Sequence, residues 1–503
     1  MKKFFKENWS FVLSGLIVLV LFFFRLYNLT ILPVFADEAI YIRWSQVMRA
    51  EETLRFLPLS DGKQPLFMWV VIPFLKIFSD PLFAGRFVSV ASGFGTLVGV
   101  GVLTYLLFKS RRAALAASLI YAVSPFTFFF GRLALVDSSL TMFGVWTFIF
   151  AYLAVTRERL DFAMLAGFAL GGAWLTKSPA LFFALLLPAL WIFVKSPKNL
   201  FKVIPLTIVT WVIGYGMYNI LRLGPNFSLI AARNLDYIWP FGHFLTSPLD
   251  PLKPFVDRSF EWIRMMGPWP VMVIWLLGYV VNWKKNWKQM IVLTAWFLVP
   301  IVIQSEFAKV FTARYILFSI PFLIILAASA FIEERKKRVN ALVFVLAFFV
   351  AQAFIFNRWL IINPEKANLP RSERSGYLEE WTAGYGIAEI AQFAKGQYLK
   401  NPNEKIVIGT EGFFGTLPDG LQIYLNDRPE ITVIGVGLNF DTLHTSLIES
   451  KKSGNKTYLV VNKSRFHNDP ARFGLKIVEE YPKAQSPDGS RDSLLFVEIE
   501  NEK

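Results

Sequence analysis

Long apolar stretches separated by short clusters of charged residues make up most of the chain before Arg358. A helix that crosses a membrane needs about 20 mostly apolar residues. Marking these stretches from one charge cluster to the next predicts eleven spans: Trp9–Leu29, Arg86–Phe108, Ala113–Phe130, Ser138–Thr156, Phe162–Thr176, Pro179–Lys195, Val203–Leu221, Ile263–Asn282, Gln289–Ser305, Thr312–Phe331 and Val339–Asn357. The pattern therefore predicts a mainly α-helical, polytopic membrane protein.

The composition agrees with this prediction. Hydrophobic residues make up 54% of the chain, and charged residues make up 18%, below the about 25% of soluble domains. A net charge of +15 could indicate nucleic-acid binding, but the basic residues lie between apolar segments, so a membrane protein explains them better. The chain has no Cys, which excludes disulfides, cysteine catalysis and zinc–thiolate sites. We expect the protein to contact membrane lipid and to bind no nucleic acid.

The orientation in the membrane follows from the distribution of Lys and Arg in short loops, because cytoplasmic loops carry an excess of these residues. With eleven spans, six basic clusters fall on one side: Lys2/Lys3/Lys6, Lys109/Arg111/Arg112, Arg157/Arg159, Lys195/Lys198/Lys202, Lys284/Lys285/Lys288 and Arg335/Lys336/Lys337/Arg338. This predicts a multi-pass plasma-membrane protein with a cytoplasmic N-terminus and an extracytoplasmic segment after Asn357.

One apolar segment, Pro65–Phe78, is too short for a span. We interpret it as a helix that lies in the outer membrane interface or enters it partway. The first outer loop then runs over residues 30–85 and is unusually long. A second large outer loop covers residues 222–262.

From about Pro364 the pattern changes to short segments typical of strands, which alternate with helical segments. The predicted strands are Lys405–Gly409, Ile431–Val436, Thr457–Val461 and Leu494–Ile499, and the predicted helices are Ile387–Leu399 and Asp441–Lys451. We therefore predict a transmembrane domain over residues 1–363 and an extracytoplasmic α/β domain over residues 364–503.

Two groups of acidic residues lie just outside predicted spans. Asp37 and Glu38 follow the first span, where they could hold a divalent metal ion or accept a proton from an acceptor hydroxyl. Asp137 lies in the next outer loop, on the same side. Ordinary alternatives remain open, because Asp37 can be a solvated loop acid and either Asp can cap a helix.

Several cations map to the same outer face, where they could hold a phosphate at the lipid–water boundary. They are Lys63, Arg86, Arg132, Lys177, Arg222, Arg233, Arg258 and Arg314. Anchoring of the membrane interface is the alternative for each of them. Anchoring explains Lys177 and Arg314 less well. Lys177 lies in a tight turn, and Arg314 precedes Tyr315 at the start of a helix, where a cation opposes the helix dipole.

The order of these motifs resembles a known group of enzymes. An acidic pair after the first helix is followed by Lys63-Gln64-Pro65-Leu66, Arg86, Arg132 with Asp137, Lys177 and Arg314-Tyr315. This order is similar to that of the polyprenyl-phosphate-sugar-dependent glycosyltransferases of the C superfamily (GT-C), particularly bacterial relatives of the protein O-mannosyltransferases and of the lipid A aminoarabinose transferase. Gln64 departs from the family pattern, which has Pro there. The resemblance covers residues 1–357.

The resemblance implies transfer of a monosaccharide from a polyprenyl-phosphate donor to a hydroxyl of a protein or glycolipid on the extracytoplasmic side. It implies that Asp37 is the base, with Glu38 and Asp137 as further catalytic acids. The donor phosphate would be held by a set of basic and aromatic residues: Lys63, Arg86, Arg132, Lys177, Arg314 and Tyr315. Displacement in one step predicts inversion at the anomeric carbon. No cofactor is expected to be required, although a divalent metal could bind at Asp37 and Glu38.

Two other functions fit the same sequence. One is a ligase that transfers a whole lipid-linked oligosaccharide. The other is a transporter or flippase of a lipid-linked substrate, which would place its acids at the bilayer centre rather than at the outer boundary.

Overall fold

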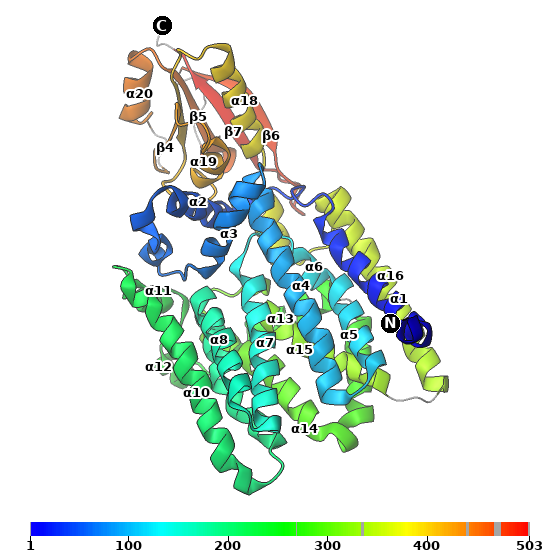
Figure 1. The fold of residues 1–503 in the computed structure, drawn as a ribbon. Helices are drawn as coiled ribbons and strands as arrows, with labels where there is room; N and C mark the ends of the chain where they lie inside the picture. The colour runs from blue at the N-terminus through cyan, green and yellow to red at the C-terminus, as the bar shows by residue number, and fades with distance from the viewer. Residues whose placement is uncertain (1, 268, 333–335, 439–441, 467–473, 501–503) are drawn as a thin grey trace.

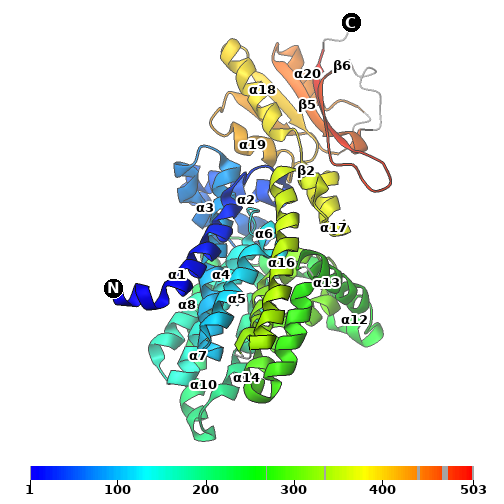
Figure 2. The same ribbon diagram turned by 90° about the vertical axis from the view of Figure 1, so that its right-hand side faces the viewer.

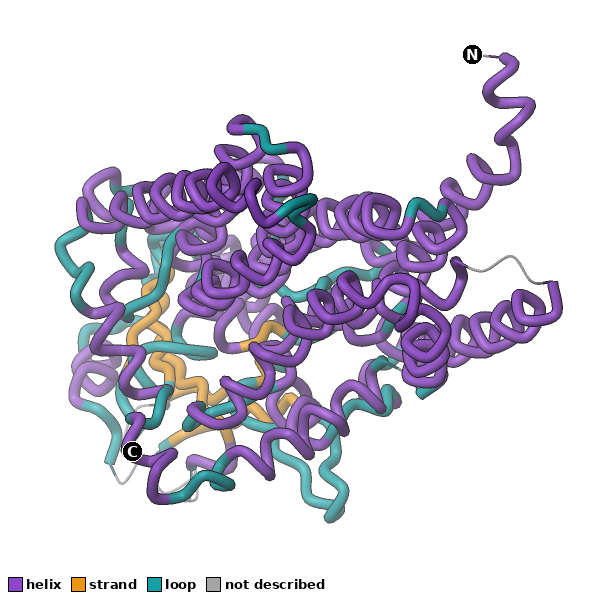
Figure 3. Tube along the Cα trace, turned by 90° about the horizontal axis from the view of Figure 1, so that it is seen from below, coloured by secondary structure: helices purple, strands orange, loops and turns teal. Residues whose placement is uncertain are grey.

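The computed structural model describes residues 2–267, 269–332, 336–438, 442–466 and 474–500. Figures 1 and 2 show a long bundle of helices with a β-sheet at one end, and short helices between the two. Seen from below in Figure 3, helices dominate the fold and the strands form one compact group. Two residues named in the predictions, Arg335 of the last basic cluster and Asp441 of the last predicted helix, lie outside the described residues.

The bundle is built from long apolar helices, as the hydropathy pattern predicts. Its helices are α1 (Lys2–Phe23), α4 (Pro81–Phe108), α5 (Arg111–Val123), α6 (Pro125–Phe130), α7 (Val136–Arg157), α8 (Leu160–Thr176), α9 (Leu181–Leu186), α10 (Leu200–Tyr218), α14 (Pro270–Phe307), α15 (Ile320–Ala328) and α16 (Lys336–Ile362). Within the described residues, six helical segments are long and apolar enough to cross a membrane, and four apolar helices are shorter. The chain is thus a multi-pass membrane protein, but the predicted count of eleven spans is not confirmed.

Proline and glycine explain where the predicted spans are interrupted. The segment 113–130 is divided at Ser124, because Pro125 begins a new helix. The segment 179–195 is a mixture of 3₁₀ and α turns around Pro179 and Pro188. The predicted span 263–282 is cut near Gly267, where α13 (Leu252–Met266) ends.

The helix α14 contains two arms that lie side by side. Asn286 has non-helical backbone angles, and the Thr294 hydroxyl lies 3.4 Å from the Tyr279 hydroxyl. In a straight helix these two residues would be about 22 Å apart, so the chain must turn back near Asn286. This agrees with the sequence interpretation of two consecutive segments joined by a basic turn.

Short helices lie between the bundle and the sheet (Figure 1). They are α2 (Ala36–Ala50) and α3 (Leu66–Ile77), whereas α11 (Leu229–Tyr237), α12 (Phe241–Thr246) and α13 lie beside the helices of the bundle. The prediction that Pro65–Phe78 contains a helix too short for a span is confirmed, since α3 has 12 residues. Both predicted outer loops are therefore largely helical rather than irregular.

The C-terminal region forms a five-stranded sheet with the order β4–β3–β5–β7–β6. The strands are β3 (Ile406–Thr410), β4 (Ile431–Gly435), β5 (Lys456–Asn462), β6 (Leu475–Pro482) and β7 (Ser493–Ile499), and the helices α18 (Ile387–Lys400), α19 (Asp419–Leu425) and α20 (Thr445–Lys452) pack around them. β3, β4 and β5 are parallel, whereas β6 and β7 are antiparallel to their neighbours. The four predicted strands are present. β6 escaped prediction because it is a largely exposed edge strand with charged positions.

The C-terminal region is fixed directly to the segment that carries Asp37. β1 (Val34–Phe35) pairs with β2 (Ala383–Gly384), and the Ala36 N–H donates to the Thr382 carbonyl at 3.1 Å. The Gln46 amide on α2 also donates to the Ile423 carbonyl at 2.8 Å. The apolar core continues from the bundle into this region, so the sheet is packed onto one end of the bundle. The division at residue 363 stays a prediction.

Candidate active site

Glu38 on α2 and Arg86 on α4 form a buried ion pair. Both side chains are fully buried, and the Glu38 carboxylate accepts from Arg86 Nε at 2.8 Å and Nη2 at 2.7 Å. The same carboxylate also accepts from the N–H groups of Phe35 and Ala134. Four donors leave no oxygen of Glu38 free for a substrate or a metal ion. This geometry indicates a structural role for both residues, while the predicted catalytic role of Glu38, the predicted metal site at Asp37 and Glu38, and the predicted phosphate-binding role of Arg86 stay predictions.

Arg132 is also buried and holds the backbone rather than facing a ligand. Its guanidinium donates to the carbonyls of Arg25, Tyr27 and Asn28 at 2.7–2.9 Å. Arg25, which the sequence analysis did not single out, donates in turn to the Thr127 carbonyl and hydroxyl. These contacts indicate a structural role for Arg132, and its predicted role as a phosphate ligand stays a prediction. Together these arginines fix the segment that leads from the first helix to Asp37.

Asp37 lies in the first turn of α2 and contacts two cations from distant segments. Its carboxylate lies 3.4 Å from Lys63 Nζ and 2.5 Å from Arg314 Nη2, although Arg314 is 277 positions away in the chain. Burial by itself would raise the pKa of Asp37, but the charges of Arg314 and Lys63 more than offset it and hold the pKa below its usual range. Asp37 is therefore an anion at neutral pH.

Asp137 and Lys177 form a second acid–cation pair. Asp137 lies in the first turn of α7, and Lys177 follows α8, so the two meet where these helices come together. Lys177 Nζ lies 2.7 Å from Asp137 Oδ1, while the buried Asp137 Oδ2 has no hydrogen-bond partner. The helix-capping alternative for Asp137 does not hold, because α7 shows no side-chain cap.

Tyr315 joins the two pairs into one cluster. Lys177 Nζ lies 4.3 Å from the centre of the Tyr315 ring, and the Arg314 guanidinium lies 5.5 Å from the same ring. Six of the nine predicted site residues are thus brought together: Asp37, Lys63, Asp137, Lys177, Arg314 and Tyr315. With three cations and two carboxylates, the cluster has an excess of one positive charge.

Part of the chain matches a described family and a curated relative. Residues 62–215, which include Lys63, Asp137 and Lys177, match the family described as dolichyl-phosphate-mannose-protein mannosyltransferase. An undecaprenyl phosphate-alpha-4-amino-4-deoxy-L-arabinose arabinosyl transferase of Pectobacterium carotovorum is 27% identical over 287 residues. That match covers 52% of this chain and 48% of the relative, so the chain matches about half of the relative's length.

Solved structures match nearly the whole chain. ArnT from Cupriavidus metallidurans in the apo state has a TM-score of 0.61 at 17% identity and covers 98% of both chains. The resemblance predicted from the sequence is confirmed. The same ArnT bound to undecaprenyl phosphate has a TM-score of 0.60 at 16% identity, with 97% of this chain and 98% of that chain covered. This chain therefore has an ArnT-like fold.

The ArnT-like fold brings further residues to the cluster that the sequence analysis missed. Asp61 lies 3.3 Å from Lys63 and 3.5 Å from Arg233, and a charged residue two positions before Lys63 could have been noticed. Tyr377 comes from the C-terminal region and packs on Phe35 with ring centres 4.3 Å apart. No sequence signal pointed to Tyr377, because it reaches the site only through tertiary packing.

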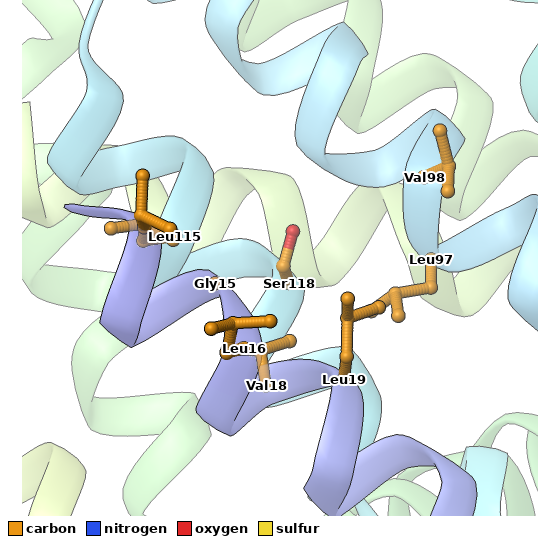
Figure 4. Close-up of a pocket in the computed structure, with 9 residues that line it drawn as sticks. Gly15, Leu16, Val18, Leu19, Leu97, Val98, Leu115 and Ser118 are labelled. Carbon is orange, nitrogen blue, oxygen red and sulfur yellow. The ribbon is translucent and has the colours of Figure 1, made fainter. Parts of the chain in front are cut away.

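A cavity elsewhere in the ArnT-like fold has a different character. Figure 4 shows an apolar cavity of about 330 Å³ between α1, α4 and α5. It is lined by Val12, Gly15, Leu16, Val18, Leu19, Leu97, Val98, Leu115 and Ser118. None of these lining residues is charged, so the cavity differs in character from the cluster around Asp37.

The described part of the chain contains no group of three or more His, Cys, Asp or Glu residues arranged to hold a metal ion.

Proposed function

We propose that this chain is an integral membrane glycosyltransferase that moves a monosaccharide from a polyprenyl-phosphate donor to an acceptor hydroxyl on the extracytoplasmic side. The observation that carries the proposal is the cluster of Asp37, Lys63, Asp137, Lys177 and Arg314 within an ArnT-like fold. The solved ArnT bound to undecaprenyl phosphate supports a polyprenyl-phosphate donor for this fold. The acceptor that we propose is a protein or a glycolipid.

The three cations bind the donor phosphate in this proposal. Lys63, Lys177 and Arg314 are partly exposed, unlike Arg86 and Arg132. Positive charge placed where the leaving phosphate gains negative charge lowers the barrier to transfer. The cations supply this stabilisation themselves, so the step as proposed requires no metal ion.

Asp37 acts as the base. The acceptor oxygen forms a bond to the anomeric carbon, the bond from that carbon to the phosphate oxygen breaks, and Asp37 takes the hydroxyl proton. Polyprenyl phosphate leaves with the bonding electrons, and the configuration at the anomeric carbon inverts. Lys63 and Arg314 hold the pKa of Asp37 low. A donor phosphate that shares these two cations would raise that pKa and make Asp37 a better base.

In this proposal Asp137 holds Lys177 in place and orients the transferred sugar. Its Oδ1 holds Lys177, and its buried, unpartnered Oδ2 is free to accept from a hydroxyl of the transferred sugar. In this scheme Asp37 accepts the proton and Asp137 orients the sugar, so no second proton transfer is needed.

The membrane orientation that we propose places the cluster outside. The helix α7 starts at Val136, beside Asp137, and ends at Arg157 in a basic cluster, after about 33 Å of helix. That length matches the hydrocarbon core of a bilayer. Because basic clusters mark the cytoplasmic side, the site, the short helices and the sheet lie on the extracytoplasmic side, and the N-terminus is cytoplasmic.

The direct test is an assay of the purified full chain in lipid nanodiscs with a panel of undecaprenyl-phosphate monosaccharides. We expect release of undecaprenyl phosphate together with a glycosylated acceptor from a membrane extract. A whole oligosaccharide in the product would instead identify a ligase, and donor movement across the bilayer without bond cleavage would identify a flippase. Either outcome would overturn the proposal.

Reversing a cation should weaken donor binding. Lys63→Glu and Arg314→Glu each replace a cation of the cluster with a further carboxylate, so we expect the Kd for undecaprenyl phosphate to rise by about tenfold to a hundredfold. Lys202→Glu, in a basic cluster outside the site, is the matched control. An unchanged Kd in both site variants would mean that Lys63 and Arg314 are only anchors.

The pH dependence of donor binding should depend on Lys177. Burial, the largest effect, lowers the pKa of Lys177 from its usual value, and the charge of Asp137 only partly opposes it. As pH rises, Lys177 thus loses its proton earlier than an exposed Lys, and donor binding should fall with it. The Lys177→Arg variant stays charged. The pH at which donor binding falls, measured as the Kd for undecaprenyl phosphate, should therefore be higher in this variant. If donor affinity falls at the same alkaline pH in both proteins, Lys177 does not take part in donor binding.

A further inference from the structure

Two aromatic contacts of α1 mark the ends of the apolar cavity between α1, α4 and α5. Near the C-terminal end of α1, the rings of Phe22 and Phe94 have centres 6.1 Å apart, which joins α1 to α4. Toward the N-terminal end of α1, the Arg111 guanidinium lies 5.6 Å from the centre of the Phe11 ring, which joins α1 to the start of α5. The cavity of about 330 Å³ lies between these two contacts (Figure 4).

The α1 residues that line the cavity form one helical face. Val12, Gly15, Leu16 and Leu19 follow the spacing i, i+3, i+4 and i+7, and residues of α4 and α5 complete the lining. Leu16 is 50% exposed and Val98 on α4 is 40% exposed. The cavity therefore opens to the side of the bundle, which in a multi-pass membrane protein faces lipid.

The glycine in this face leaves room for a ligand. A Cβ built at Gly15 meets no atom within 4 Å, whereas a Cβ built at Gly93 on α4 would lie 3.4 Å from Phe22. An apolar cavity of about 150 Å³ can hold benzene, so a cavity of twice that volume can hold an acyl segment of about ten carbon atoms.

The depth of the cavity matches one leaflet of a bilayer. On α5, Leu115 and Ser118 lie about 6 Å and 10 Å along the helix from Arg111. On α4, Leu97 lies about 16 Å before the end of the helix at Phe108. Half of the hydrocarbon core is about 15 Å thick. An acyl chain whose headgroup lies at the loop between α4 and α5 therefore reaches the cavity.

This loop is strongly basic. Lys109, Arg111 and Arg112 are exposed, and residues 105–118 contain no Asp or Glu. Arg111 lies one helical turn before Leu115, so the two side chains share the face of α5 that borders the cavity. Basic segments beside a membrane attract anionic lipid headgroups.

We propose that the cavity holds one acyl chain of an anionic phospholipid whose headgroup lies against Arg111 and the neighbouring cations. The cavity shares no residue with the cluster around Asp37, so this lipid site is separate from the proposed sugar transfer. The donor phosphate proposed for that cluster would lie beyond the opposite end of α1. The basic loop thus favours a phospholipid over the polyprenyl tail as the occupant. The lipid would fill the space that separates α1 from α4 and stabilise their packing.

The first test is native mass spectrometry of the full chain, titrated with phosphatidylglycerol or phosphatidylcholine of identical acyl chains. We expect one phosphatidylglycerol to bind at least tenfold more tightly than phosphatidylcholine. Gly15→Leu places a side chain in the cavity and favours the helix, so it should weaken phosphatidylglycerol binding at least tenfold. The matched control is Gly216→Leu on α10, where a built Cβ also meets no atom within 4 Å. This control should bind phosphatidylglycerol normally.

A second measurement locates the lipid in the folded, membrane-embedded chain. Phosphatidylglycerol with a diazirine in the middle of one acyl chain, added in trace amount to phosphatidylcholine nanodiscs, should label α1 and α5 on illumination. This labelling should be lost in Gly15→Leu and kept in Gly216→Leu. Arg111→Gln/Arg112→Gln should remove the preference for phosphatidylglycerol and leave the affinity for phosphatidylcholine unchanged.

Three results would overturn the proposal. The first is equal affinity of the unmodified chain for the two phospholipids, and the second is normal binding and labelling in Gly15→Leu. The third is displacement of phosphatidylglycerol from α1 and α5 by undecaprenyl phosphate, which would assign the cavity to the polyprenyl tail. Absence of sugar transfer would defeat the proposed function only, because none of these measurements depends on turnover.

Discussion

Asp37→Asn should abolish sugar transfer while the protein still folds and binds its donor. Asn has nearly the same shape but cannot take the acceptor proton, and loss of a general base costs about 10²–10⁴-fold in rate. Donor affinity should hold or improve, because Lys63 and Arg314 lose a competing carboxylate. Single-turnover kinetics and a Kd for undecaprenyl phosphate measure the two effects separately.

The matched control is Asp161→Asn, which changes an exposed carboxylate that pairs with Arg159 at the opposite end of the bundle. Its turnover should stay normal. Turnover near that of the unmodified chain in Asp37→Asn would remove Asp37 from the mechanism and leave it as a partner of two structural cations.

Glu38→Ala should destabilise the protein strongly, although Glu38 is adjacent to Asp37. The substitution leaves Arg86 buried without its counter-charge and removes the acceptor of two backbone N–H groups. Breaking a buried pair in this way costs about 3–5 kcal/mol. Thermal unfolding in detergent should show a large drop in Tm and poor recovery of folded protein.

Two variants distinguish this structural role from catalysis. Arg159→Ala breaks an exposed pair and should cost at most about 1 kcal/mol. Glu38→Gln/Arg86→Met, which removes both charges, should recover part of the stability lost in Glu38→Ala. If Glu38→Gln instead kept its Tm and lost turnover alone, Glu38 would belong to the catalytic machinery after all.

The contrast between Asp37 and Glu38 marks how far the sequence could predict the site. Position after the first apolar helix predicted that both acids lie on the outer side, and this orientation stays a prediction. However, adjacent residues on a helix point in directions about 100° apart, so only one of them can face the cluster. Which one does so depends on where Arg86 and Arg314 pack, and these contacts span 48 and 277 positions.

The arginines show the same limit. Charge distribution predicted that Arg86, Arg132 and Arg314 share one side of the membrane, and the structure places them at the same end of the bundle. The charge distribution could not predict that Arg86 and Arg132 point inward to backbone carbonyls, whereas Arg314 reaches Asp37. Whether an arginine side chain points inward depends on tertiary packing, which cannot be predicted from the periodicity of the sequence.

The fold was predictable where the local signal was strong. Long apolar runs gave helices, and short β-branched runs gave β3, β4, β5 and β7. The count of eleven spans is not confirmed, and Pro125 and Pro188 interrupt two of the predicted apolar runs, although proline is a visible signal for a break. The attachment of β2 to β1 joins segments about 350 positions apart, so only the structure reveals that the C-terminal region supports Asp37.

We propose that cations from distant segments hold a polyprenyl phosphate in one extracytoplasmic pocket beside Asp37. The chain lacks Cys, so Lys63→Cys and Lys177→Cys each introduce a single thiol into the cluster and leave two of its three cations. The decisive measurement is the rate of labelling of each thiol by a membrane-impermeant maleimide, with and without undecaprenyl phosphate. Both thiols should react from the outside, and undecaprenyl phosphate should protect both. Labelling from opposite sides of the membrane, or rates that undecaprenyl phosphate leaves unchanged, would contradict the claim.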